Sequence, residues 1–150
     1  MSTFAIANAA GRVAWGWLFD RMAPSSIIRL NLFAQAGVLA GVFFIVRDLP
    51  TLLLFAGLAG FNYGGVLVLY ASTVARRWGL QHVGQVYGLL FTANIVASPA
   101  PMAAGFSLDV LGSFTPAFLL FAAIAAAAAL RVGRAVNERA VRLTDNEERK

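Results

Sequence analysis

Long apolar segments follow one another along this chain, and only short polar connections separate them. Most of these segments reach the roughly 20 residues that an α-helix needs to cross about 30 Å of hydrocarbon. Of the 150 residues, 59% are hydrophobic and 13% are charged, whereas soluble domains carry about 25% charged residues. The sequence therefore predicts an all-α integral membrane protein with four to five transmembrane helices. The expected spans are residues 3–19, 26–46, 51–74, 86–108 and 114–133.

The basic residues stand at the ends of the apolar segments and in a charged tail. We expect one transmembrane domain at 1–135 and a charged cytoplasmic tail at 136–150. A nucleic-acid partner is excluded, because such a surface needs Lys and Arg gathered on a soluble face. The chain has no cysteine, and His82 is its only histidine. We therefore predict neither a metal site nor a cofactor.

Small and polar residues inside the spans predict contacts between helices. Three Gly-x-x-x-Gly patterns, at 37–41, 60–64 and 84–88, are expected to let helix backbones approach closely. Asn31 and Gln35 lie one turn apart, and we expect them to contact a neighbouring helix.

Four stretches carry a resemblance to a known family. The run GRVAWGWLFDRM (11–22) resembles the loop signature of the major facilitator superfamily. The runs FNYGG (61–65), VGQVYGLLFTAN (83–94) and GSFTPAF (112–118) look like later helices of its oxalate/formate antiporter-like branch. The resemblance implies a C-terminal fragment, about helices 8–12, equivalent to most of the C-terminal half of such a transporter. Ala23 departs from the signature, which has a glycine there.

The resemblance also implies a conformational loop motif made by Gly16, Asp20 and Arg21. In the family this aspartate pairs with helix-end groups and holds one conformation of the transport cycle. Gly16 is expected to admit a neighbouring helix, while the alternative is that Asp20 and Arg21 simply end a helix at the water interface. Arg12 lies two turns further in, where it needs a polar partner or must extend its stem to the interface.

Polar and aromatic residues on two of the expected spans predict a substrate site. Tyr87, Phe91, Asn94 and Ser98 fall on one helical stripe of the fourth span. On the third span, Asn62 and Tyr63 precede a double glycine, and Tyr70 lies two turns beyond Tyr63. Aromatic walls with a few hydrogen-bonding groups suit a small molecule, although such residues also join helices to one another. The candidate substrate-binding residues are Tyr63, Tyr70, Tyr87, Phe91 and Asn94.

Asn94 also bears on the charge of the substrate. The oxalate-transporting relative that the resemblance points to aligns a lysine there, whereas Asn94 is neutral. We therefore expect a monoanion or a neutral solute rather than oxalate.

Pro99 and Pro101 predict a kink in the same span.

The sequence thus predicts transmembrane transport of a small organic anion or related solute, incomplete in this chain alone. No catalytic constellation is present, so an enzyme is not expected. The expected partners are the lipid bilayer, a small-molecule solute, and the missing N-terminal half or a second copy. Two alternatives stay open, a self-contained homo-oligomeric transporter and a non-transporting assembly subunit.

The arginines at the helix ends predict the sidedness of the chain in a cell (plasma or inner) membrane. Arg21, Arg29, Arg76, Arg77 and the tail fall on one side, which the positive-inside rule places in the cytoplasm.

A cysteine introduced by Asp145→Cys should therefore resist an impermeant maleimide added to intact cells. A cysteine introduced by Asp109→Cys, on the opposite side, should react. Labelling of residue 145 from outside would contradict this orientation.

Overall fold

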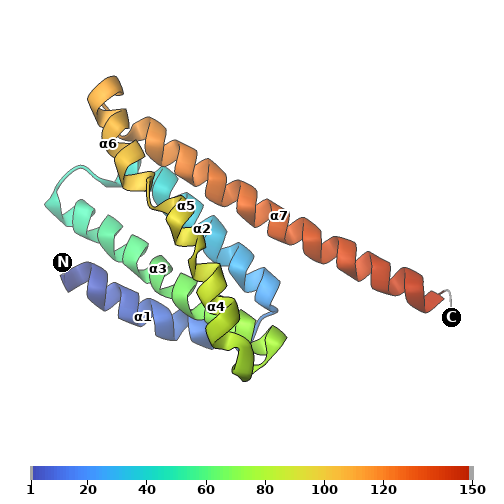
Figure 1. Cartoon of the computed structure of the whole chain (residues 1–150). Coiled ribbons are helices and arrows are strands. Elements are labelled where there is room, and N and C mark those ends of the chain that lie inside the picture. The colour runs from blue at the N-terminus through green and yellow to red at the C-terminus, as the bar shows by residue number, and fades with distance from the viewer. Residues whose placement is uncertain (1, 149–150) are drawn as a thin grey trace.

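All the regular structure in the part of the chain that the computed structural model describes, residues 2–148 with side chains for residues 3–132, is helical (Figure 1). This confirms the predicted all-α class. The helices are α1 (Ser2–Phe19), α2 (Pro24–Ile45), α3 (Leu49–Trp78), the 3-10 helix η1 (Leu80–His82), α4 (Val83–Phe91), α5 (Ala93–Ala97), α6 (Ala100–Leu111) and α7 (Thr115–Glu148).

Four helical segments are long and apolar enough to cross a membrane. They are Pro24–Ile45, Leu49–Trp78, Leu80–Leu111 and Thr115–Val132. The first expected span, 3–19, forms helix α1 but is not one of these four. Its polar residues Asn8 and Arg12 lower its mean hydropathy, and α1 lies alongside α3 (Figure 1).

The expected span 86–108 is not one continuous helix but the series α4, α5 and α6. The Thr92 hydroxyl donates to the Leu89 carbonyl at 2.6 Å, and the Ser98 hydroxyl donates to the Ile95 carbonyl at 2.9 Å. Such back-bonding bends helices, and Pro99 then lacks a backbone N–H. The kink predicted at the prolines is therefore present, and a second break occurs at Thr92.

Other helix ends also differ from the expected spans. A capping box formed by Asp48 and Thr51 begins α3, which continues to Trp78. Gly79 ends α3 with a φ of 84°, and Gly112 ends α6 with a φ of 66°. Glycine adopts this left-handed conformation at little cost. Helix α7 continues past residue 133 into the expected tail.

Backbone atoms of α1 and α3 lie unusually close together. A Cβ atom at Gly60 would stand 2.6 Å from the Phe4 carbonyl oxygen, and one at Gly64 would overlap the Asn8 carbonyl oxygen. From the other side, a Cβ atom at Gly11 would overlap the carbonyl oxygen of Phe61. The Gly60-x-x-x-Gly64 prediction is confirmed. We call these contacts of Gly11, Gly60 and Gly64 the glycine seam.

The other two glycine patterns do not mediate contacts between described helices. A Cβ atom at Gly37, Gly84 or Gly88 would meet nothing within 4 Å, because these positions face away from the neighbouring helices. A Cβ atom at Gly41 would meet only Ile45 of the same helix. The packing predicted for 37–41 and 84–88 is therefore not found among the described residues and stays a prediction.

A buried amide cluster joins α2 to α3. The Asn31 side-chain amide donates to the Asn62 side-chain oxygen at 3.0 Å and to the Asn62 carbonyl at 3.2 Å. Asn62 in turn donates to the Gln35 side-chain oxygen at 2.7 Å and to the Asn31 carbonyl at 3.1 Å. The predicted interhelical contacts of Asn31 and Gln35 are confirmed. Asn62 is buried and serves this cluster.

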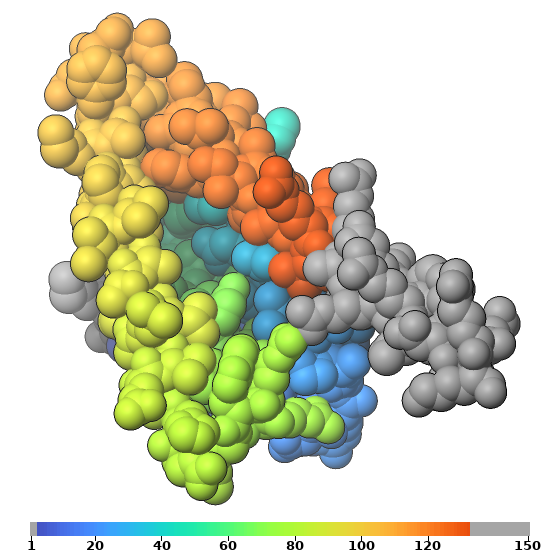
Figure 2. Space-filling model, turned by 45° about the vertical axis from the view of Figure 1, so that its right-hand side comes forward, coloured from blue at the N-terminus to red at the C-terminus, as the bar shows by residue number. Residues whose placement is uncertain are grey.

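Helix α7 packs along α2, and α6 packs against the beginning of α7. The Phe118 ring of α7 meets Phe43 of α2 and Phe55 of α3, with centroids 6.2 and 6.3 Å apart. In the space-filling view, the α4–α6 segment and α7 stand on either side of a hollow with parts of α2 and α3 at its floor (Figure 2).

The glycine seam predicts different effects for two chemically identical substitutions. Gly64→Val should lower the free energy of unfolding by about 1–3 kcal/mol, because its Cβ atom meets backbone atoms of α1. Gly37→Val is the matched control, since its Cβ atom meets nothing within 4 Å. Unfolding in mixed detergent micelles, followed by circular dichroism, measures both. Equal effects would contradict the seam.

The capping box predicts a pH dependence at the start of α3. The pKa of Asp48 is lowered, first because the Thr51 hydroxyl donates to its carboxylate and second because the Thr51 N–H does so. A lowered pKa stabilises the fold above the unfolded value of about 3.9, and this stabilisation is lost as the pH falls through the folded value. Thr51→Val should raise the pKa of Asp48, whereas Thr51→Ser should keep it low. Carboxyl carbon shifts in an NMR titration would show whether Val and Ser differ.

Candidate functional site

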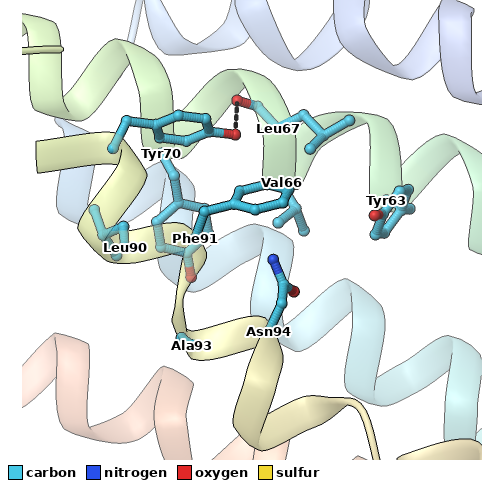
Figure 3. A pocket seen from close by; sticks show the side chains of 9 residues that line it. Tyr63, Val66, Leu67, Tyr70, Leu90, Phe91, Ala93 and Asn94 are labelled. Carbon is cyan, nitrogen blue, oxygen red and sulfur yellow. Dashed lines mark hydrogen bonds between the residues drawn. The ribbon is translucent and has the colours of Figure 1, made fainter. Parts of the chain in front are cut away.

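A cavity of about 320 Å³ lies between α3 and the segment α4–α5 (Figure 3). All five candidate substrate-binding residues from the sequence line this one cavity. Apolar side chains fill the rest of its wall. The lining residues are Tyr63, Val66, Leu67, Tyr70, Tyr87, Leu90, Phe91, Ala93 and Asn94.

Helix α3 supplies one wall because its lining residues fall on a single helical face. Tyr63, Val66, Leu67 and Tyr70 are spaced at i, i+3, i+4 and i+7. Tyr63 is half exposed, so the cavity is open beside it. Its ring also lies 6.3 Å from the ring of Phe4 on α1, which brings α1 to the edge of the site.

Helices α4 and α5 supply the opposite wall. The Tyr87 and Phe91 rings pack one turn apart with centroids separated by 5.8 Å. The Tyr87 hydroxyl donates to the Leu67 carbonyl across the site at 3.5 Å, a long hydrogen bond (Figure 3). Asn94 follows the break at Thr92, and its side chain is directed into the space between α5 and α3 (Figure 3).

The cavity walls are mainly apolar, with a few hydrogen-bonding groups and no formal charge. None of its nine lining residues has an ionisable acidic or basic side chain other than the tyrosine hydroxyls. Three hydroxyls and one carboxamide provide the hydrogen-bonding groups, and aromatic rings provide the apolar surface. This composition suits one small solute with a polar head.

Sequence reasoning missed the apolar part of the wall and included residues that do not belong to it. Val66, Leu67 and Leu90 lie three or four residues from the predicted tyrosines, a spacing that would have identified them. Ser98, expected on the same stripe, does not line the cavity, and its hydroxyl bonds to the Ile95 carbonyl.

Among the described residues, no group of three or more His, Cys, Asp or Glu side chains is placed to hold a metal.

Arg12 and the loop motif lie outside the cavity lining. The Arg12 Nε donates to the Asn8 side-chain oxygen at 3.0 Å, so its polar partner comes from its own helix. At Gly16 a Cβ atom would stand 3.5 Å from Val68, an ordinary contact, and the close approach occurs at Gly11 instead. Asp20 is exposed, and Arg21 donates to the Trp17 carbonyl at 3.1 Å. The conformational role of Gly16, Asp20 and Arg21 stays a prediction.

Four segments of membrane-spanning length with a partly open aromatic cavity beside them define a multi-pass helical membrane protein. Comparison with known proteins then gives its family. Residues 1–150 match the family model of the Major Facilitator Superfamily, and the chain belongs to this superfamily of membrane transporters.

Curated relatives share modest identity with the chain. It is 25% identical to the "Uncharacterized MFS-type transporter YhjX" of Escherichia coli (strain K12), over 61% of the chain and 23% of that protein. It is 29% identical to "Monocarboxylate transporter 13" of Rattus norvegicus, over 80% of the chain and 28% of that protein. It is also 29% identical to "Probable transporter MCH1" of Debaryomyces hansenii, over 72% of the chain and 22% of that protein.

The chain thus spans about a quarter of the length of the curated relatives that it matches. No solved structure matches it. The oxalate/formate antiporter-like branch stays a prediction, since the matches are to transporters with other names.

Proposed function

We propose that this chain forms most of the C-terminal half of a secondary transporter that carries a small monocarboxylate or a related small solute across the cell membrane, with the C-terminus in the cytoplasm. The observation that carries the proposal is the convergence of Tyr63, Tyr70, Tyr87, Phe91 and Asn94 on one cavity. The name of the rat relative, a monocarboxylate transporter, supports the same class of substrate.

The uncharged walls of the cavity favour a monoanion or a neutral solute. A dianion at this depth would need more than one cation to offset the loss of hydration. Asn94 offers two N–H donors and a carbonyl acceptor, and each tyrosine offers one hydroxyl. These groups can orient a carboxylate or a hydroxyl, while the rings of Tyr87 and Phe91 contact the carbon skeleton.

Arg12 is a candidate source of a single positive charge inside the complete transporter. Phe4, Asn8 and Arg12 are spaced four residues apart on one stripe of α1, and the Phe4 ring adjoins the cavity residue Tyr63. The Arg12 side chain is exposed in the body of a helix. In a bilayer such a group faces a polar cavity or a partner rather than lipid. We therefore place the Arg12 side chain in the interior of the complete transporter.

The remaining walls of the site belong, in this proposal, to the other half of the transporter. Sites of this kind lie near the middle of the membrane between two halves. The chain covers about a quarter of its relatives, and the cavity is open beside the half-exposed Tyr63 and Phe91. A solute bound there would stay exposed on one side unless the other half of the transporter enclosed it.

Substitutions at Asn94 test the proposal in a full-length relative with the same cavity residues. Asn94→Ala should raise the KM for a monocarboxylate about fivefold, which corresponds to one lost hydrogen bond of about 1 kcal/mol. Asn94→Lys should shift preference towards a dianion such as oxalate. Val96→Ala is the matched control, because Val96 lies on the same short helix, is 85% exposed and does not line the cavity.

Uptake of labelled substrate into proteoliposomes measures all three variants. Unchanged uptake in both Asn94 variants would remove Asn94 as a substrate contact. High-affinity oxalate transport by the unmutated relative would contradict the charge argument.

A further inference from the structure

Two exposed tryptophans mark one end of the helix bundle, and an arginine lies over each ring. The Arg21 guanidinium carbon stands 3.7 Å from the centre of the Trp17 ring, and that of Arg77 stands 5.3 Å from the Trp78 ring. Trp17 is 55% exposed and Trp78 is 46% exposed. Because tryptophan is enriched at the level of the lipid headgroups, this end of the bundle belongs at a membrane surface.

The ends of three helices converge at this point. Phe19 from the end of α1, Ile27 from the start of α2 and Leu69 from α3 belong to one buried cluster. The Arg76 guanidinium of α3 lies 5.9 Å from the Phe19 ring. Arg76 therefore reaches the end of α1 just before the turn that carries Arg21.

The beginning of α2 lies at the same end and presents the positive end of its helix dipole, although Pro24 offers no backbone N–H. Its N-cap residue Ala23 provides no side-chain hydrogen bond, and its first turn contains no acidic residue. A helix N-terminus without such a partner favours a negative charge. Within residues 20–29 and 75–85, four exposed arginines accompany a single carboxylate, that of Asp20. These arginines are Arg21, Arg29, Arg76 and Arg77.

We propose that this end of the bundle binds the phosphate of an anionic phospholipid headgroup, with Arg21 and Arg76 as its main cationic contacts. Guanidinium groups bind phosphate oxygens in a bidentate manner, and basic clusters beside transmembrane helices bind anionic lipid. The exposed apolar surface around the arginines favours a lipid over a dissolved phosphate. Trp17, Trp78 and Leu80, which is 84% exposed, contact the acyl region.

Tryptophan fluorescence provides a readout located at the site itself. The full chain is reconstituted into bilayers of dibrominated phosphatidylcholine, whose bromines quench the exposed Trp17 and Trp78. The third tryptophan, Trp15, is buried, and Trp15→Phe removes its background from every sample. Unbrominated phosphatidylglycerol or zwitterionic phosphatidylethanolamine is then mixed in. The lipid that is bound preferentially beside the tryptophans restores more fluorescence, which gives its affinity relative to phosphatidylcholine.

We expect phosphatidylglycerol to be preferred over phosphatidylethanolamine. Arg21→Gln and Arg76→Gln should each lower its relative affinity about fivefold. Arg47→Gln is the matched control, an exposed arginine in the connection between α2 and α3 at the other end of these helices. It should leave the preference unchanged.

Three results would overturn the proposal: no preference for phosphatidylglycerol, an equal loss in the Arg47 variant, or full displacement of the lipid by excess glycerol 3-phosphate. The last result would assign the site to a soluble phosphate. Helix content by circular dichroism verifies that each variant is folded. Arg21→Gln and Arg76→Gln are measured separately. If one of them misfolds, the relative lipid affinity of the other still tests the proposal. The outcome is independent of the solute that the transporter carries.

Discussion

Close contact between the backbones of α1 and α3 holds the rest of this structure in place. Inside a bilayer, apolar side chains gain little by leaving lipid for a neighbouring helix, so association depends on tight packing and hydrogen bonds. The glycine seam provides the packing, since Gly11, Gly60 and Gly64 each face a backbone carbonyl of the other helix. Tyr63 lies between two of these residues along α3, so the seam also fixes the side of the helix on which the cavity forms.

Adjacent residues of α3 face different neighbours. Asn62 is almost fully buried and bonds to Asn31 and Gln35 of α2, whereas Tyr63 lines the cavity. Consecutive residues point about 100° apart around a helix. A hydrogen-bonded α2 therefore leaves the neighbouring face of α3 available to α4 and α5. The amide cluster and the cavity tyrosines therefore lie on neighbouring faces of the same helix.

The sequence predicted the helices well because span length and hydropathy are local properties. It also predicted the shared cavity, since the spacing of Tyr63 and Tyr70 and of Tyr87, Phe91 and Asn94 defines helical faces. It says less where neighbours decide the outcome. Gly37 and Gly84 have the same local pattern as Gly60, but of the three only Gly60 meets another helix within the part of the chain that the structure describes. At the break, the Thr92 hydroxyl bonds to the backbone carbonyl of Leu89. The apolar sequence around Thr92 gives no sign of this hydrogen bond.

The division of the fourth span into three short helices has a mechanical consequence. Helix α4 packs on α3, and α6 packs on α7, whereas α5 joins these two anchored pieces. Helical hydrogen bonding is interrupted on both sides of α5, at Thr92 and at Ser98–Pro99, so no continuous ladder holds α5 in line with either neighbour. Asn94 is thus carried on a five-residue helix between two anchored pieces rather than inside one rigid rod.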